Sequence, residues 1–385
     1  MAISRRAVIR VVSAGAVLAG AGAFGLSRCD LMPDEAVEAW GGPGARETDP
    51  RRRALAYALL APNPHNTQAW IADLRTQDRI VFTLDRTRLL PATDPYSRQI
   101  AIGCGCFLEL LRMAAAEDGI RAEIALFPDG AWPDGEVGDT PLARVDFIAD
   151  ASVTKDPLFP SAQRRRTNRK PFDAEALRGE HAAAIVEAID DPAIRYEASS
   201  AAGMVSALKN TARQAWTAEY MTARTHQETV NYLRVGASEI AAHRDGILLH
   251  GPDIWWAKML GLITPEALSK PGSIPFQNGL DQYIEAIEGT ASFGWFSTAA
   301  NDRAAQVAAG RAYLRIALTC AGLGVALHPL SQALQEFPEV AEQMRAIRAL
   351  TQTPDGHTLQ MFFRLGYGPT TEPAPRRKLA DIVRA

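Results

Sequence analysis

Two long apolar segments, far apart in the chain, constrain its fold most strongly. Residues 100–117 are predicted to form a buried helix in which Gly103 and Gly105 allow close packing. Residues 302–322 are predicted to form a second apolar helix, which contains Gly310. Each helix is ended by glycine and followed by an apolar, strand-like stretch. This weak repetition predicts an internal duplication with two related core helices.

The composition is that of a soluble, folded chain with a sizeable core. Of the 385 residues, 47% are hydrophobic and 22% are charged, which excludes a disordered, fibrous or multi-span membrane protein. The formal net charge of −3 gives no electrostatic footprint for nucleic acid. Four cysteines are too few for a disulfide scaffold, and no zinc-site or P-loop motif is present. A small-molecule ligand is therefore the expected partner.

The first 28 residues are predicted to be an export signal. Arg5-Arg6 lies in a basic segment, and no charge follows from Val11 to Ser27. The segment is short and weakly apolar for a spanning helix, and small residues at 19–23 offer cleavage sites. It resembles a twin-arginine signal, which implies the twin-arginine translocase as a partner and a periplasmic location. Retention of the leader as a membrane anchor is the alternative.

The rest of the chain divides into three predicted parts. Residues 29–52 are rich in Pro, Gly and charge, and are predicted to be a linker. Residues 53–150 mix helical and strand-like segments, and so do residues 151–385, where helical periodicity dominates from 182 to 242. The predicted class is therefore α+β with two halves. The second half contains a predicted helical insertion at about 205–290, which could act as a lid.

One polar loop is the most informative stretch of the sequence. It reads Pro62-Asn63-Pro64-His65-Asn66-Thr67-Gln68-Ala69-Trp70. Polar side chains on a proline-stiffened turn can present fixed donors and acceptors to a flat polar ring. An Asx-type turn that caps a helix has a similar composition and is the structural alternative.

Two arginine-rich motifs are candidates for binding a phosphate. The first is Arg165-Arg166-Thr167-Asn168-Arg169 with Phe172 downstream, and the second is Arg376-Arg377 near the C-terminus. Guanidinium groups bind phosphate in a bidentate manner and stay charged at every relevant pH. The alternatives are a solvated basic face for the first motif and an ordinary charged tail for the second.

The loop and the two arginine motifs, in this order, resemble the flavin-dependent nitroreductase family and especially its Acg-like branch. The loop is similar to that branch's Pro-x-Pro-His-Asn-Thr-Gln-Pro-Trp sequence, with Ala69 in place of the proline before the tryptophan. Asn63 stands where many members of the family have serine. The resemblance covers about residues 50–149 and 160–385. It implies a nitroreductase-like fold and a non-covalently bound FMN.

The resemblance also implies roles for individual residues. Arg165, Thr167 and Arg169 would hold the ribityl phosphate and the pyrimidine edge of FMN, and the C-terminal arginine pair would reach the phosphate. Thr298, at a predicted strand end, is a candidate to approach flavin N5, with a helix N-cap as its alternative role. No catalytic side chain is required, because the flavin carries the chemistry. The predicted cofactor-binding residues are Pro62, Asn63, His65, Asn66, Gln68, Arg165, Thr167, Asn168, Arg169, Thr298, Arg376 and Arg377.

The loop occurs only in the first half and the Arg-x-Thr-x-Arg motif only in the second. Ordinary nitroreductases are homodimers with two FMN sites, so the resemblance implies a pseudo-dimer, a monomer that imitates a dimer, with one complete FMN site. The expected function is an FMN-dependent oxidoreductase that transfers hydride or electrons through flavin N5 to a small-molecule acceptor. NAD(P)H is a candidate electron donor. The alternatives are a flavin-binding or flavin-sequestering protein without turnover, and a specialised flavin reaction such as reductive dehalogenation.

Overall fold

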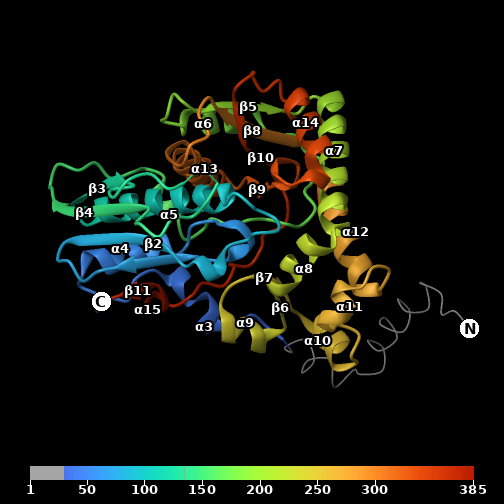
Figure 1. Ribbon diagram of the computed structural model, residues 1–385, viewed down its shortest axis with the longest axis horizontal. Coiled ribbons are helices and arrows are strands. Elements are labelled where there is room, and N and C mark those ends of the chain that lie inside the picture. Colours follow the sequence, from blue (N-terminus) through green and yellow to red (C-terminus); the bar gives the residue numbers. More distant parts are fainter. Residues whose placement is uncertain (1–29, 134) are drawn as a thin grey trace, which may run out of the picture.

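The computed structural model describes residues 30–133 and 135–385. The predicted export signal lies outside the described residues. Figure 1 shows two large β-sheets with two long helices, α5 (Arg98–Glu117) and α13 (Arg303–Leu323), in the middle of the molecule. This combination of helices and mainly antiparallel sheets confirms the predicted α+β class.

The first sheet is built mainly from the first half of the chain. β1 pairs with β2, β2 with β4 and β4 with β3, and all three pairings are antiparallel. The C-terminal strand β11 adds to β1 in parallel, so the end of the chain completes the sheet that its beginning forms. In sheet order, the strands are β11 (Val383–Arg384), β1 (Trp70–Asp73), β2 (Arg79–Leu84), β4 (Ala143–Ala149) and β3 (Ile120–Leu126).

The second sheet repeats this topology. β5 pairs with β8, β8 with β10 and β10 with β9, again in antiparallel fashion. In both sheets a long helix follows an inner strand and leads to the strand at the sheet edge. The next strand in the chain then pairs between the inner strand and the edge strand. Thus β2, α5, β3 and β4 correspond to β8, α13, β9 and β10. The strands in sheet order are β5 (Arg195–Ser199), β8 (Ser292–Thr298), β10 (Thr358–Gly366) and β9 (Ala326–Pro329).

The two core helices cross at glycines in equivalent positions, each seven residues after the first residue of its helix. A Cβ atom on Gly105 would lie 2.0 Å from the carbonyl oxygen of Val307, and a Cβ atom on Gly310 would lie 1.9 Å from that of Ile102. Each glycine thus faces the carbonyl three residues before the other. This reciprocal contact is what an internal duplication predicts. Among the described residues, α5 is the one helix long and apolar enough to cross a membrane, and it is mostly buried in the core.

A long insertion, residues 200–291, separates β5 from β8, where the first half has only the short turn 74–78. Figure 1 shows this insertion along one side of the molecule. α7 and α12 of the insertion share an apolar cluster with β8, β10 and α14. The elements of the insertion are α7 (Ala202–Met221), α8 (Ala223–Asn231), β6 (Leu233–Val235), α9 (Ala237–His243), β7 (Ile247–Leu249), α10 (Pro252–Met259), α11 (Pro265–Ser269) and α12 (Ile274–Glu288).

The remaining helices are short and flank the two sheets. Asp49 caps the helix before the polar loop by accepting a hydrogen bond from Arg51 N, and Pro50 stands at its first position. The α-helices are α3 (Asp34–Val37), α4 (Pro50–Ala58), α6 (Gly179–Glu187), α14 (Ala341–Leu350) and α15 (Leu379–Ile382). The 3₁₀ helices are η1 (Glu38–Gly41), η2 (Pro64–Asn66), η3 (Arg86–Arg88), η4 (Phe159–Ser161), η5 (Gln332–Leu334) and η6 (Pro338–Val340).

Two segments differ from their predicted structure. The predicted linker, residues 29–52, contains α3, η1 and the start of α4. Burial of Trp40 in the core orders this segment despite its polar composition. The predicted helical run from 182 to 242 is interrupted by β5, which is held in the sheet by pairing with β8. A five-residue strand with mixed exposure gives too little periodicity to be detected.

Candidate functional site

The polar loop between α4 and β1 has a strained and well-braced backbone. His65, Asn66 and Gln68 have φ values of 47°, 52° and 49°, in the left-handed region that non-glycine residues rarely adopt. The side chain of Asn63 braces the loop, because its Oδ1 accepts a hydrogen bond of 2.9 Å from Gln68 N. The loop lies directly against α5, where a Cβ on Gly103 would come within 3.1 Å of Asn63 Cβ. Such strain is typical of functional loops that the surrounding fold holds in place.

The fold brings the loop and both arginine motifs together. Leu60 O, at the start of the loop segment, accepts hydrogen bonds from Arg165 Nη2 at 3.0 Å and from Arg376 Nη2 at 3.2 Å. Arg376 Nη1 also donates to Asn66 Oδ1 at 2.9 Å, and Asn66 Nδ2 donates to Pro375 O at 3.0 Å. Three segments that are more than 100 residues apart therefore meet around Leu60. Of the predicted residues, Asn66, Arg165 and Arg376 form the centre of this arrangement.

The two central arginines are buried without a carboxylate. Arg165 and Arg376 are each 3% exposed, and neither forms an ion pair among the described residues. Burial and neighbouring arginines lower the pKa of Arg165 to about 10, and the same two causes hold the pKa of Arg376 well below its usual value. The Nε of each has no hydrogen-bond partner in this part of the chain. Buried, uncompensated positive charge is costly, so the arrangement fits a bound anion.

Arg169 and His65 extend the site beyond the central arginines. Arg169 is exposed to solvent, yet surrounding protein lowers its pKa by desolvation. Burial, together with the charge of Arg169, lowers the pKa of His65 to about 4, so its imidazole is neutral at physiological pH. The buried His65 Nδ1 and Thr67 Oγ1 have no hydrogen-bond partner among the described residues.

The low pKa of His65 predicts a specific loss of stability in acid. An unfolded histidine binds a proton below pH 6.5, whereas folded His65 does so only below about pH 4. The unfolded state therefore binds more protons in this window, and the free energy of unfolding falls as the pH falls from 6.5 to 4. His65→Gln should lose less stability than the wild type between pH 7 and pH 5, as measured by urea unfolding. Equal losses in both proteins would show that His65 is not a buried neutral base.

Gln68 and Arg377 tie the loop to the C-terminal arm and to the insertion. Gln68 is fully buried, and its Oε1 accepts a hydrogen bond of 2.8 Å from Arg377 N. Arg377 Nη1 donates to Gln68 O at 3.0 Å, and Gln68 Nε2 donates to Arg244 O of the insertion at 2.9 Å. Gln68 thus uses both ends of its side chain within the protein. These hydrogen bonds hold Gln68 and Arg377 against the loop, and their predicted contact with the cofactor stays a prediction.

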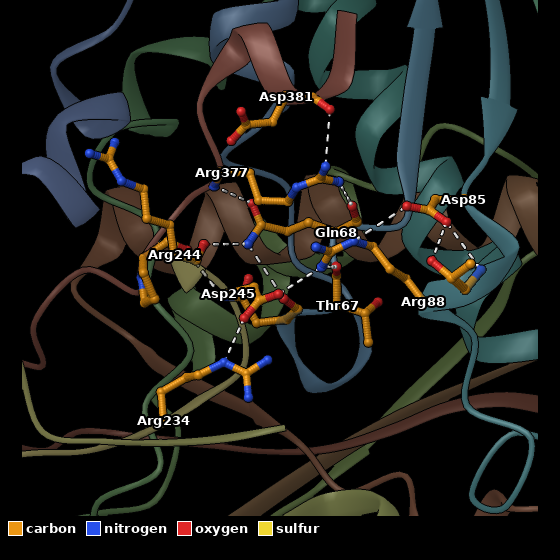
Figure 2. Close-up of polar contacts among 12 residues, drawn as sticks. Thr67, Gln68, Asp85, Arg88, Arg234, Arg244, Asp245, Arg377 and Asp381 are labelled. Atoms are coloured by element: carbon orange, nitrogen blue, oxygen red, sulfur yellow. Dashed lines mark hydrogen bonds and ion pairs between the residues drawn. The ribbon is translucent and has the colours of Figure 1, made fainter. Parts of the chain in front are cut away.

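A buried carboxylate fastens the insertion to the same loop. Asp245 is 2% exposed and accepts hydrogen bonds from Arg88 Nη1 at 2.6 Å and from Arg234 Nε at 2.8 Å. Figure 2 shows Asp245 between these arginines, beside Thr67 and Gln68. Arg88 Nη1 also donates to Thr67 O, and Gly246 N donates to Asn66 O at 3.2 Å. The turn after α9 is therefore latched directly onto the polar loop.

Other predicted residues lie at the margin of this arrangement. Pro62 is buried, and Thr167 Oγ1 accepts a hydrogen bond of 3.4 Å from Arg165 Nη1. The side chain of Asn168 donates a hydrogen bond of 2.8 Å to Pro369 O and accepts one from Lys170 N. Its polar atoms therefore bond to the backbone of two neighbouring segments. Thr298 Oγ1 donates to Ala300 O and accepts from Gln360 Nε2. Among the described residues, no hydrogen bond joins Thr298 to the loop or to either arginine motif.

Two residues of the site, Trp40 and Arg364, were not predicted from the sequence. Trp40 contacts the arginine motifs, and its only signal was a tryptophan within an otherwise polar segment. Arg364 is fully buried in β10, where its Nε donates to His328 Nδ1 at 3.0 Å. The other end of Arg364 donates to the carbonyls of Asn168 and Lys170, so it holds the segment of the first arginine motif. An arginine inside an apolar strand pattern is a signal that could have indicated this role.

The chain resembles two Mycobacterium tuberculosis proteins, one along most of its length and the other over about a third of it. It is 27% identical over 363 residues to a Mycobacterium tuberculosis protein provisionally named an NAD(P)H nitroreductase, and the alignment covers 89% of this chain and 94% of that protein. The protein provisionally named NAD(P)H nitroreductase acg, also from M. tuberculosis, is 35% identical over 129 residues, which cover 32% of this chain and 36% of that protein. No protein-family profile matches the sequence. The predicted resemblance to nitroreductase-like proteins, including Acg, is confirmed.

Solved structures similar to the chain cover a little over half of it. The FMN-dependent nitroreductase NfnB from Mycobacterium smegmatis, solved in complex with NADPH, matches 59% of this chain and 99% of its own, with 19% identity and a TM-score of 0.37. A nitroreductase with bound FMN from Desulfitobacterium hafniense matches 60% of this chain and 100% of its own, with 13% identity and a TM-score of 0.37.

Proposed function

We propose that the chain is an FMN-dependent oxidoreductase of the nitroreductase type. The observation that carries the proposal is the pair of buried, carboxylate-free guanidiniums of Arg165 and Arg376 beside the polar loop. Their two unpartnered Nε atoms fit a phosphate, which accepts several charge-assisted hydrogen bonds. The names of the M. tuberculosis relatives support the same activity.

The residues of the site fit the parts of an FMN molecule. Arg165, Arg376 and Thr167 would hold the phosphate, because they combine positive charge with a hydroxyl donor. The strained loop at His65 would support the isoalloxazine ring with fixed polar groups, and Arg169, whose charge acts on His65, would place a positive charge beside the ring. Bound FMN would supply hydride or electron transfer to a small-molecule acceptor. A cation beside the ring favours negative charge that builds up there.

The two halves of the chain each contribute part of this single site. The loop comes from the first half, and the Arg-x-Thr-x-Arg motif from the second. The position equivalent to the loop, between α6 and β5, is shorter and carries Asp190 and Asp191, which would repel a phosphate. We therefore infer one FMN site per chain in a monomeric pseudo-dimer. Export by the twin-arginine pathway to the periplasm, with the leader cleaved or kept as an anchor, is part of this proposal.

Rapid mixing in the absence of oxygen tests the oxidoreductase function. The FMN-loaded protein is mixed with NADH or NADPH, and the flavin absorbance is followed, with dithionite as the control for reducible flavin. We expect bleaching by at least one nicotinamide cofactor and reoxidation by a nitroaromatic acceptor. Bleaching by dithionite alone would refute NAD(P)H-dependent turnover and favour flavin storage.

Flavin storage without turnover is the second candidate, and the latch at Asp245 favours it. Because the insertion bonds directly to the loop, it would restrict both release of FMN and access of a reductant. Asp245→Asn removes the carboxylate that Arg88 and Arg234 share, so we expect FMN release to accelerate roughly tenfold. Recovery of flavin fluorescence after dilution measures this rate. Asp253→Asn, an exposed carboxylate in α10, is the control, and equal rates in both variants would contradict a latch.

A further inference from the structure

Trp40, in the predicted linker, packs against the arginine cluster formed by Arg165, Arg166 and Arg376. Trp40 is 8% exposed, and three guanidiniums surround its ring. The guanidinium carbon of Arg166 lies 4.2 Å from the ring centroid, that of Arg376 lies 5.1 Å away, and that of Arg165 lies 5.6 Å away. All three distances are within the range of cation–π attraction. A single indole therefore contacts arginines from both motifs.

Hydrogen bonds from Trp40 also reach both arginine-bearing segments. Its Nε1 donates to Ala374 O at 2.7 Å, two residues before Arg376. Its carbonyl accepts a hydrogen bond of 2.9 Å from Gln163 Nε2, two residues before Arg165. The preceding helix α3 adds a third contact, because Ala36 O accepts a hydrogen bond of 2.9 Å from Arg376 N. The short segment from α3 to η1 thus joins two motifs that are more than 200 residues apart.

This arrangement addresses the electrostatic repulsion among Arg165, Arg166 and Arg376. Three like charges repel one another, and no carboxylate among the described residues pairs with them. The negative face of an indole offsets part of this repulsion without occupying the hydrogen-bond donors that an anion needs. A carboxylate in the same place would neutralise the cluster and compete with the phosphate. An aromatic ring keeps the arginines together and leaves the Nε donors of Arg165 and Arg376 without a partner among the described residues.

We propose that Trp40 is a positioning residue that preorganises Arg165, Arg166 and Arg376 for the phosphate of the ligand. The proposal rests on the proposed FMN site and adds to it a determinant of selectivity for phosphorylated flavin over flavin without phosphate. Trp40 contacts the arginines, and the arginines contact the phosphate. The segment from residue 34 to residue 41 then belongs to the site, because it holds the arginines in position.

Affinities for two flavins that differ only in the phosphate test this role. The dissociation constants of FMN and riboflavin are measured by fluorescence quenching for the full chain, for Trp40→Leu and for Trp40→Phe. Trp40→Leu should lower the preference for FMN over riboflavin roughly tenfold, while riboflavin affinity stays unchanged. Trp40→Phe keeps an aromatic face and should retain most of the preference. Trp132→Leu is the matched control, because Trp132 is 5% exposed and also donates to a backbone carbonyl, but in the loop between β3 and β4.

The outcomes separate this inference from the function on which it rests. A wild-type chain that binds neither flavin would refute the proposed FMN site. A wild-type chain that prefers FMN, with the same preference in Trp40→Leu, would refute the role of Trp40. An equal loss of affinity for FMN and for riboflavin in Trp40→Leu would also refute the role of Trp40, because that pattern indicates a general structural defect.

Discussion

Replacement of Arg165 by glutamine is expected to abolish retention of FMN during purification. Arg165 contributes one of two buried guanidiniums at the proposed phosphate position, and charge-assisted hydrogen bonds to a phosphate are among the strongest in proteins. We expect the dissociation constant for FMN to rise about 100-fold or more in Arg165→Gln. Arg165→Lys keeps the charge but not the planar pair of donors, so its loss should be smaller. Titration of the flavin-free proteins with FMN measures both constants.

The same variant separates a ligand-binding role from a structural one. Removal of a desolvated charge beside Arg166 and Arg169 relieves repulsion, so the free energy of unfolding of flavin-free Arg165→Gln should be unchanged or higher than that of the wild type. Arg164→Gln, an exposed arginine in the same run, is the control and should bind FMN normally. A destabilised flavin-free Arg165→Gln with unaltered FMN affinity would show that Arg165 serves the fold instead.

Replacement of Gly310 by alanine is expected to destabilise the chain severely. The added Cβ would lie 1.9 Å from Ile102 O, a backbone atom that cannot rotate away. Relief requires α5 and α13 to separate along the centre of the core, so we expect a loss of about 3 kcal/mol or more in the free energy of unfolding. Gly105→Ala should have a similar effect, because its Cβ would lie 2.0 Å from Val307 O.

Gly203→Ala is the matched control for these glycine substitutions. Gly203 lies in α7 with no atom within 4 Å of its added Cβ, so alanine should leave stability unchanged or raise it by up to about 1 kcal/mol. Urea unfolding of the flavin-free proteins measures all three variants. A loss below about 1 kcal/mol in both Gly105→Ala and Gly310→Ala would contradict a tight reciprocal crossing of the core helices.

The sequence predicted most reliably the elements with strong local patterns. Both core helices were predicted to within a few residues, because their apolar runs are long and end at glycine. The strand-like segments expected in both halves correspond to strands in which apolar residues dominate or alternate, such as β2, β4, β8 and β10. The loop at Pro62–Gln68 and the first arginine motif were found as motifs, and the structure brings them together.

The missed features depend on contacts between distant parts of the chain. β5 and β11 are short strands that exist because they pair with β8 and β1. Trp40 is buried against the segments that carry Arg166 and Arg376, which are far from it in the sequence. Thr298 at a strand end stays a predicted flavin contact, and in the fold its hydroxyl bonds to Gln360 and Ala300, which lie far from it in the sequence or in the following turn. Local sequence carries no information about such pairings.

Native mass spectrometry of the full chain titrated with FMN tests the central claim most directly. The claim is that two unequal halves of one chain form a single FMN site. It predicts a monomer that binds one FMN, and an Arg165→Gln variant that binds none under the same conditions. A monomer that binds no FMN, or two FMN molecules per chain, would contradict it.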